Sequence, residues 1–236
     1  AFNFEKLVAP DSIAALRAKV AADAKPKRAT AQRDDSGFSE SATAATTHFL
    51  VVDAQGDIVS ATQSLSIHFG AGVVPPGTGV VLNDSMSNFM FSDPHALNFV
   101  APGKRPRSTI SPTIVFRAGR PVFAMGIPGS SRIPTAMLQA LLDRLVFNRP
   151  LADAIGDTRV HFESNWRRND EESFEAEDSF PAAEVAALQA RGWKVTLPEV
   201  AGAGHLFGGI NAIEINADGT LTGFADPRRT NAAAGY

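Results

Sequence analysis

The stretch Glu40-Ser41-Ala42-Thr43-Ala44-Ala45-Thr46-Thr47-His48-Phe49 joins two parts of the chain that differ in character. Before it, residues 24–45 are mostly charged or small and show no apolar periodicity, which is typical of an exposed linker. After it, residues 47–53 form a β-rich run, and residues 58–65 continue the pattern beyond a Gln55-Gly56-Asp57 turn. We therefore predict a linker that leads directly into a buried β-hairpin whose first side chains are hydroxyls.

Thr46 stands where a cut in this linker would create a new N-terminus. A terminal threonine carries a hydroxyl nucleophile and an α-amine with a reference pKa of about 8, so one residue can supply both nucleophile and general base. The alternative is that Thr46 and Thr47 only begin a strand, where threonine is common. The junction alone leaves both interpretations open.

Strand-like and helix-like segments alternate in the rest of the chain. Ahead of the linker, residues 11–23 have Ile13, Leu16 and Val20 at helical spacing on one face. Further elements are predicted as strands at residues 113–116, 121–125, 193–197, 207–215 and 220–224, and as helices at residues 133–147, from Pro150, and from Pro181 to Arg191. The polar run from Arg167 to Ser179 is predicted to be a solvated loop. This order indicates an α+β protein with helices layered on largely antiparallel sheets.

Composition excludes several kinds of function. The chain has 236 residues, 44% hydrophobic and 20% charged, which suffices for one sizeable core. A formal charge of −3 gives no electrostatic reason to expect nucleic acid or an acidic membrane as a partner, and no apolar run approaches the length of a membrane span. The absence of cysteine excludes thiolate metal sites and a cysteine nucleophile, and the five histidines lack metal-ligand spacing. Any nucleophile must be Ser, Thr, Lys or a carboxylate.

Five motifs follow the linker in order. They place hydroxyl, amide and glycine residues in loops and at strand ends: Thr46-Thr47-His48-Phe49, Leu82-Asn83-Asp84-Ser85-Met86-Ser87-Asn88-Phe89, Lys104-Arg105-Pro106-Arg107-Ser108-Thr109-Ile110-Ser111-Pro112-Thr113, Gly126-Ile127-Pro128-Gly129-Ser130-Ser131-Arg132-Ile133, and Asp226-Pro227-Arg228 with the terminal Gly235-Tyr236. Together they resemble the gamma-glutamyltranspeptidase family. The resemblance implies an N-terminal-nucleophile hydrolase, built as a four-layer αββα sandwich from a self-cleaving precursor.

The resemblance also divides the chain and assigns catalytic roles. Residues 1–45 match the end of the large subunit with the pre-cleavage linker, and residues 46–236 match the catalytic small subunit, with cleavage between Ala45 and Thr46. Thr46 then attacks an amide carbonyl, and Ser64, in place of the usual threonine, hydrogen-bonds the Thr46 hydroxyl.

The glycine-rich loop after residues 121–125 matches the oxyanion hole of the family. Gly129 and Ser130 occupy the positions of its two backbone N–H donors, with Ser130 where the family usually has glycine. A backbone donor survives that change if its backbone angles can be met without glycine. The alternative is that this loop is only a tight turn before a helix.

Five further positions match the substrate pocket of the family. Ser108 and Thr109 match the hydroxyl pair that holds the substrate α-carboxylate; ordinary turn or capping duty is the alternative. Asn88 replaces the Asp that pairs with the substrate α-ammonium, Ser85 replaces a Gln, and Ser66 replaces an Asn. The lost carboxylate removes a charge-assisted hydrogen bond, so recognition of a γ-glutamyl group is placed in doubt.

The resulting hypothesis is a Thr-dependent γ-glutamyl hydrolase or acyltransferase that acts on glutathione-like amides, with water or an amine as acceptor. The alternatives are a related acylase for glutaryl-type amides and an uncleaved, non-catalytic homologue that acts as a binding protein. The resemblance implies the large subunit as partner, no cofactor, no metal, and a periplasmic or secreted location.

Overall fold

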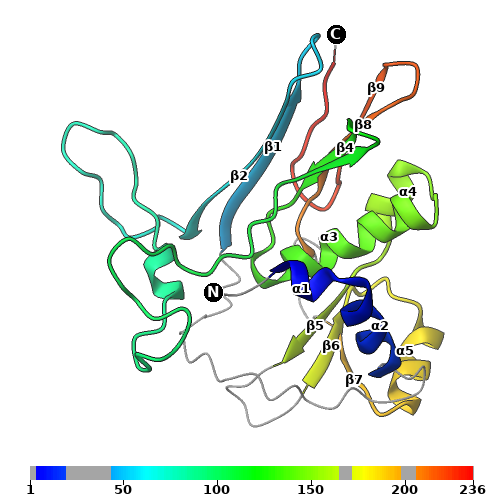
Figure 1. Cartoon of the computed structure of the whole chain (residues 1–236), viewed down its shortest axis with the longest axis horizontal. Coiled ribbons are helices and arrows are strands. Elements are labelled where there is room, and N and C mark those ends of the chain that lie inside the picture. The colour runs from blue at the N-terminus through cyan, green and yellow to red at the C-terminus, as the bar shows by residue number, and fades with distance from the viewer. Residues whose placement is uncertain (1–3, 20–43, 165–171, 198–205, 236) are drawn as a thin grey trace.

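A computed structural model gives the fold, and it describes residues 4–19, 44–164, 172–197 and 206–235 (Figure 1). Its helices are α1 (Phe4–Val8), α2 (Pro10–Lys19), α3 (Ile133–Leu141), α4 (Leu151–Gly156) and α5 (Ala182–Ala190). Its strands are β1 (Ala44–Val52), β2 (Ile58–Ile67), β3 (Thr113–Arg117), β4 (Arg120–Gly126), β5 (Val160–Ser164), β6 (Glu172–Ala176), β7 (Lys194–Thr196), β8 (Asn211–Ile215) and β9 (Leu221–Ala225). Two short 3-10 helices, η1 (Ser85–Asn88) and η2 (Ser130–Arg132), and a π-helical turn, η3 (Leu142–Val146), complete the elements of the described residues.

The described strands form three sheets. The β1-β2 hairpin is a sheet of its own, the second sheet has the order β3-β4-β8-β9, and the third has the order β5-β6-β7. Every pairing is antiparallel except that of β6 with β7. The third sheet is joined by edge-on contacts among the rings of Phe162, Phe174 and Trp193.

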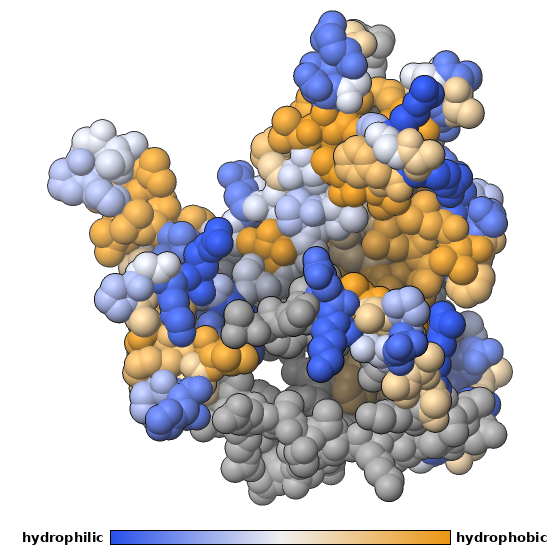
Figure 2. Space-filling view, viewed as in Figure 1, coloured by the Kyte–Doolittle hydropathy of each residue, from blue (hydrophilic) through white to orange (hydrophobic). Residues whose placement is uncertain are grey.

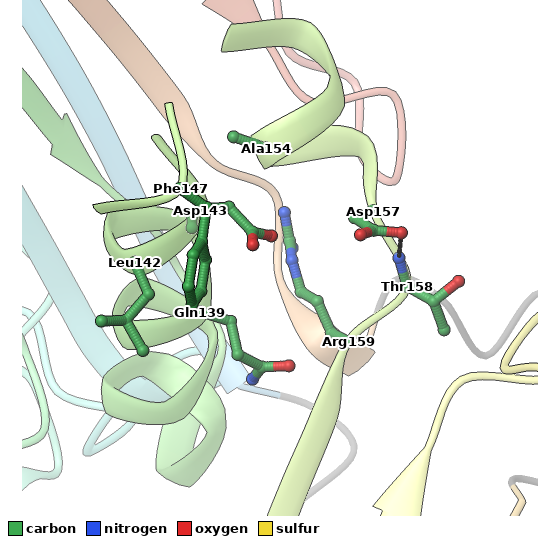
Figure 3. A pocket seen from close by; sticks show the side chains of 9 residues that line it. Gln139, Leu142, Asp143, Phe147, Ala154, Asp157, Thr158 and Arg159 are labelled. Atoms are coloured by element: carbon green, nitrogen blue, oxygen red, sulfur yellow. Dashed lines mark hydrogen bonds between the residues drawn. The ribbon is translucent and has the colours of Figure 1, made fainter. Parts of the chain in front are cut away.

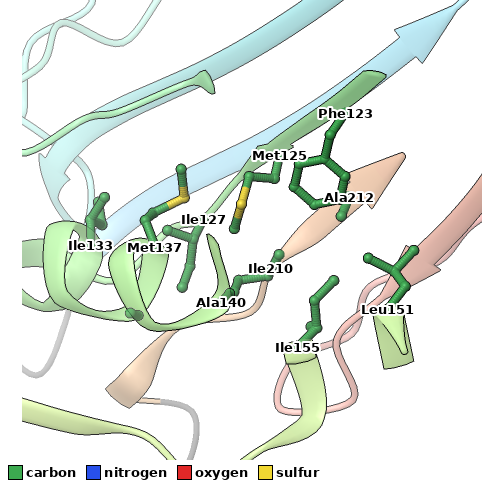
Figure 4. Packing of buried hydrophobic residues seen from close by; sticks show 11 residues of the cluster. Phe123, Met125, Ile127, Ile133, Met137, Ala140, Leu151, Ile155, Ile210 and Ala212 are labelled. Carbon is green, nitrogen blue, oxygen red and sulfur yellow. The ribbon is translucent and has the colours of Figure 1, made fainter. Parts of the chain in front are cut away.

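The second sheet lies between the β1-β2 hairpin and helices α3 and α4 (Figure 1). Strand side chains alternate between the two faces of a sheet, so Phe123 and Met125 of β4 point toward the helices. There they join Ile133 and Met137 of α3 and Ile155 of α4 in the buried core (Figure 4). The arrangement gives three successive layers, helix, sheet and hairpin, of the expected αββα order.

The far face of the hairpin carries the exposed apolar residues. Phe49, Val51 and Val59 are 46 to 53% exposed there, and no helix of the described residues covers them. The segment between β2 and β3 extends away from the sheets and carries apolar surface as well (Figures 1 and 2), with Phe69 and Leu97 the most exposed. Contiguous apolar surface of this kind is typical of a face that a partner covers.

The α+β class and both predicted hairpins are confirmed. The helix predicted for residues 133–147 is α3 followed by the π-helical turn η3. The prediction of a solvated loop was wrong for residues 172–176, because they form β6 between β5 and β7. Helix α2 ends at Lys19, and its Ile13 is exposed rather than buried; Val20 lies outside the described residues.

A buried ionic network joins the C-terminal Asp226-Pro227-Arg228 motif to the rest of the fold. Asp226 is 1% exposed, and its carboxylate accepts hydrogen bonds from Arg159 at 2.5 Å and from the Ile210 N–H at 3.0 Å. Arg228 contacts both carboxylate oxygens of Glu177, at 2.6 and 2.7 Å. These bonds hold β9, α4 and the end of β6 together behind the core.

Replacing Asp226 should therefore destabilise the fold strongly. In Asp226→Asn the buried Arg159 charge loses its partner, and we expect the free energy of unfolding to fall by about 3 to 5 kcal/mol in urea denaturation. The exposed Asp178 offers a matched control, and Asp178→Asn should change the free energy of unfolding by less than about 0.5 kcal/mol. Similar losses in both variants would contradict this role of the network.

Candidate active site

Thr46 lies near the start of β1, at an irregularity in the hairpin. Ala44 is opposite Ile67, whereas Thr46 is opposite Ser64, so two steps along β1 match three along β2. Ser66 lies on the β2 side of this irregularity and has a left-handed backbone with φ 74°. Irregularities of this kind redirect side chains and are common beside active sites. Here the irregularity faces the Ala45–Thr46 peptide bond.

The Ser64 hydroxyl lies at the centre of three hydrogen bonds. Its Oγ is 2.8 Å from Thr46 Oγ1 and 3.3 Å from the Ala45 carbonyl oxygen, and it accepts the N–H of Ser66 at 2.9 Å. A serine hydroxyl has one proton, and the carbonyl can only accept, so Ser64 donates to Ala45 and Thr46 donates to Ser64. The Thr46 hydroxyl is thus oriented beside the carbonyl of its own preceding residue.

His48 joins β1 to the second sheet, two residues beyond Thr46. Its side chain is 4% exposed and lies on the same face of the strand as Thr46. The imidazole occupies the space over Gly126, where a Cβ would come within 2.2 Å of the ring. Nδ1 is 2.7 Å from the Thr62 hydroxyl, and the His48 carbonyl accepts a bond from the Asn211 side chain at 2.9 Å. Burial of the ring lowers the His48 pKa to about 4, so the imidazole is neutral near pH 7.

The loop predicted as the oxyanion hole begins where β4 ends, at Gly126. The Gly129 carbonyl accepts the Arg132 N–H at 3.0 Å, and the Ser130 carbonyl accepts the Thr109 hydroxyl at 2.8 Å. Ser130 adopts a left-handed conformation with φ 54°. That region favours glycine, so Ser130 meets the glycine geometry in spite of its Cβ. Gly208 packs closely against the same loop, since a Cβ at position 208 would lie 2.2 Å from the Pro128 carbonyl oxygen.

Two connections bring the other predicted pocket residues to the same end of the hairpin. The Asp84 N–H donates to the Leu65 carbonyl at 3.0 Å, which sets η1, with Ser85 and Asn88, beside Ser64 and Ser66. The Asn98 side chain donates to the Asn88 carbonyl and accepts the Arg107 N–H, so the segment leading to Ser108 lies next to η1.

The predicted site residues differ in how their side chains are used. Within the described residues, no hydrogen bond involves the side chains of Ser66, Ser85 or Asn88, all half-buried. Ser108 is exposed, and its hydroxyl accepts the Ile110 N–H at 3.2 Å. Thr46, Ser64 and Thr109, by contrast, are committed to bonds within the protein.

Sequence reasoning missed the residues that hold these groups in place, namely His48, Asn98, Gly126, Gly208 and Asn211. His48 and Gly126 lie in two of the quoted motifs, and their position there was the available signal. Gly208 and Asn211 carry no local signal because each contacts a segment distant in sequence, and Asn98 lies in a segment without regular structure where no pattern indicates its two bonds.

A concavity also lies away from the predicted site residues. A pocket of about 240 Å³ opens between α3, η3 and α4, on the opposite side of the second sheet from the hairpin (Figure 3). None of the predicted site residues lines it. Within the described residues, no three His, Asp or Glu side chains are grouped to hold a metal ion, and no helix could span a membrane.

Comparison with known proteins gives the site its context. The family model described as gamma-glutamyltranspeptidase matches residues 2–236. The chain belongs to the gamma-glutamyltranspeptidase family. This confirms the family inferred from the five motifs.

Two relatives of this gamma-glutamyltranspeptidase family member differ in their described activities. The acylase ACY 1 proenzyme of Pseudomonas sp. (strain SE83) is 42% identical over 193 residues, which are 80% of this chain and 32% of the relative. The glutathione hydrolase proenzyme of Bacillus subtilis (strain 168) is 34% identical over 191 residues, 80% of this chain and 30% of the relative. The chain therefore spans about a third of the length of these relatives.

A solved structure confirms the fold class. The gamma-glutamyltranspeptidase from Pseudomonas nitroreducens complexed with L-DON matches with a TM-score of 0.67 and 31% identity, over 80% of this chain and 99% of that chain. The α+β fold of the N-terminal-nucleophile type, predicted for this gamma-glutamyltranspeptidase family member, is the observed one.

The buried His48 predicts a specific pH dependence of stability. Its pKa is about 4 in the folded protein and about 6.5 when unfolded, so protons bind preferentially to the unfolded chain between these values. The contribution of His48 to the free energy of unfolding is therefore complete above about pH 6.5. By pH 4.5 the free energy of unfolding should be about 2 to 3 kcal/mol lower. Urea denaturation at about pH 6.5 and at about pH 4.5 should show this loss in the wild type. The loss should be smaller in His48→Gln.

The exposed His95 is the control, and His95→Gln should keep the wild-type pH dependence. An unchanged dependence in His48→Gln would show that other groups cause it.

Proposed function

We propose that Thr46 is the nucleophile of a self-processing amidohydrolase and acyltransferase that acts on γ-glutamyl amides. The observation that carries this proposal is the hydrogen-bonded arrangement of Thr46, Ser64 and the Ala45 carbonyl. This arrangement follows the segment of charged and small residues at positions 24–45, in a member of the gamma-glutamyltranspeptidase family. The cleavage and the roles of the individual residues are inferred from this arrangement.

Self-processing begins with attack of Thr46 Oγ1 on the Ala45 carbonyl carbon. The C–N bond to Thr46 breaks as the new C–O ester bond forms, and the hydroxyl proton passes to the nitrogen that becomes the α-amine. The Ser64 hydroxyl, which already donates to the Ala45 oxygen, stabilises the negative charge that develops there. Water then hydrolyses the ester, which releases a carboxylate at Ala45 and regenerates the Thr46 hydroxyl.

Turnover uses the same hydroxyl on an external amide. The new α-amine takes the Thr46 proton as Oγ1 attacks the γ-carbonyl, and it returns the proton to the leaving amine as the C–N bond breaks. The backbone N–H groups of Gly129 and Ser130 stabilise the oxyanion. Water or an acceptor amine then attacks the acyl-enzyme ester, giving an acid or a new amide.

A second candidate activity is that of an acylase for glutaryl-type amides. A glutaryl group differs from a γ-glutamyl group only by the absence of the α-ammonium. Asn88 offers no carboxylate for that ammonium, and the acylase ACY 1 proenzyme is 42% identical to this chain. These two observations favour the acylase, whereas the family as a whole favours the γ-glutamyl substrate.

We further infer that residues 46–236 work with a large subunit, of which residues 1–45 are the end. The exposed apolar face formed by Phe49, Val51 and Val59 supports such a partner. In an uncleaved, non-catalytic homologue, the same face would serve only to bind a partner. Cleavage of the Ala45–Thr46 bond distinguishes the two cases.

The shared use of one hydroxyl predicts that Thr46→Ala abolishes both self-cleavage and turnover. Thr46→Ser retains a hydroxyl and should keep part of each activity. Denaturing electrophoresis with N-terminal sequencing measures cleavage, where a fragment starting Thr46-Thr47-His48 is expected. Thr47→Ala is the control and should cleave at the same bond. Normal processing by Thr46→Ala, or an uncleaved wild type, would refute the proposal.

The identity of residue 88 should determine the acyl preference. Asn88→Asp restores a carboxylate beside the α-ammonium, so the ratio of kcat/KM for γ-glutamyl over glutaryl amides should rise about tenfold or more. Asn148→Asp makes the same change at an exposed position outside the site, where no such selective gain is expected. Equal effects of Asn88→Asp on both substrates would show that residue 88 does not face the ammonium.

A further inference from the structure

We propose that Thr109 is a positioning residue that holds the oxyanion loop in its active conformation, and that Ser108 alone of this pair binds the substrate carboxylate. The inference rests on the proposed function and specifies how the same site works. It departs from the expectation that both hydroxyls bind the carboxylate.

The argument begins with the use of the Thr109 proton. A hydroxyl has one proton, and Thr109 donates it to the Ser130 carbonyl at 2.8 Å. A carboxylate accepts hydrogen bonds and cannot donate one, so it needs that same proton. Ser108 Oγ instead accepts a bond, from the Ile110 N–H, and its proton stays available on an exposed side chain. The pair is therefore divided into one donor directed to the loop and one donor open to a ligand.

Ser130 is the place where the loop needs support. The two peptide groups that flank its Cα are both hydrogen-bonded: the Gly129 carbonyl accepts the Arg132 N–H, and the Ser130 carbonyl accepts both the Ile133 N–H and the Thr109 hydroxyl. Together these three bonds keep Ser130 left-handed at φ 54°, where a residue with a Cβ is strained. The Thr109 bond is the one of the three that a side chain makes, and its loss lets Ser130 relax from the strained conformation, which turns the Ser130 N–H proposed to face the oxyanion.

Thr109 is itself anchored to the second sheet. The Ser111 hydroxyl donates to the Thr109 carbonyl at 2.9 Å, and the Thr113 hydroxyl donates to the Ser111 carbonyl at 3.1 Å. Thr113 is the first residue of β3. Three successive hydroxyl-to-carbonyl bonds thus run from the sheet to the loop, and a rigid support of this kind suits an oxyanion hole.

Kinetics of six variants of the processed enzyme test the proposal, with γ-glutamyl and glutaryl anilides as substrates. Thr109→Val keeps the side-chain shape but removes the hydroxyl. It should lower kcat about tenfold and change KM by less than about twofold, because the displaced N–H donor acts only in the transition state. Thr109→Ser keeps the hydroxyl and should restore kcat to within about threefold. Ser108→Ala should raise KM instead.

Ser130→Gly supplies the decisive background. Glycine adopts the left-handed conformation without strain, so adding Thr109→Val to Ser130→Gly should lower kcat by less than about threefold. The exposed Thr78, whose hydroxyl donates to the Pro75 carbonyl at 2.9 Å outside the site, provides the matched control: Thr78→Val should leave kcat within about twofold of the wild type.

Two results would overturn the proposal. One is a rise in KM for Thr109→Val with unchanged kcat in both backgrounds, which would make Thr109 a carboxylate ligand. The other is a crystal structure of Thr109→Val in which Ser130 keeps its left-handed angles and carbonyl direction. That structure can be determined even if the wild type hydrolyses neither anilide, a result that would count against the proposed function instead.

Discussion

The contact between the His48 imidazole and Gly126 is the constraint on which the site depends. The ring fills the space that a Cβ at position 126 would occupy, so the hairpin can approach the second sheet only where that sheet has a glycine. This approach fixes β1 against the end of β4, and with it the distance from Thr46, two residues away, to the loop after Gly126. The ring is buried and neutral, and Asn211 holds the His48 backbone from the neighbouring strand. A charged or larger group could not replace it without separating the two sheets.

The supply of hydroxyl protons decides what each residue of the site can do. Ser64 has one proton, and its bond to the Ala45 carbonyl leaves it only able to accept from Thr46. Thr109 has one proton, and its bond to the Ser130 carbonyl makes it part of the scaffold of the loop. Three half-buried side chains, Ser66, Ser85 and Asn88, have no such commitment within the described residues. Under the proposed assignment, these neutral groups stand where the resemblance places a carboxylate, so the proposed choice between γ-glutamyl and glutaryl substrates depends on them.

The core and the outer surfaces of the chain have different physical characters. Behind the second sheet, α3 and α4 pack the apolar core, and the Arg159–Asp226 pair is buried beside them. In front of it, the hairpin and the segment up to β3 expose apolar side chains that no other described part of the chain covers. Thr46, the proposed nucleophile, lies at the boundary between these two parts. Such a division fits a catalytic unit completed by another polypeptide, since burial of Phe49 and Val51 would stabilise the hairpin that carries Thr46.

The sequence by itself determined both hairpins and the family; the linker predicted before Thr46 lies, up to residue 43, outside the described residues. Local signals suffice for these features: alternating apolar residues, glycine turns, and motifs whose residues are neighbours in the chain. Residues 172–176 escaped prediction as a strand because their polar side chains suit a loop equally well, and only pairing with β5 and β7 decides the matter. The tertiary structure alone decided that Thr109 bonds to Ser130, that Ser130 is left-handed, and that His48 needs Gly126. The Thr109–Ser130 bond and the His48–Gly126 contact each join segments at least 21 residues apart. No local pattern encodes which distant group accepts a hydroxyl proton or occupies the space left by an absent Cβ.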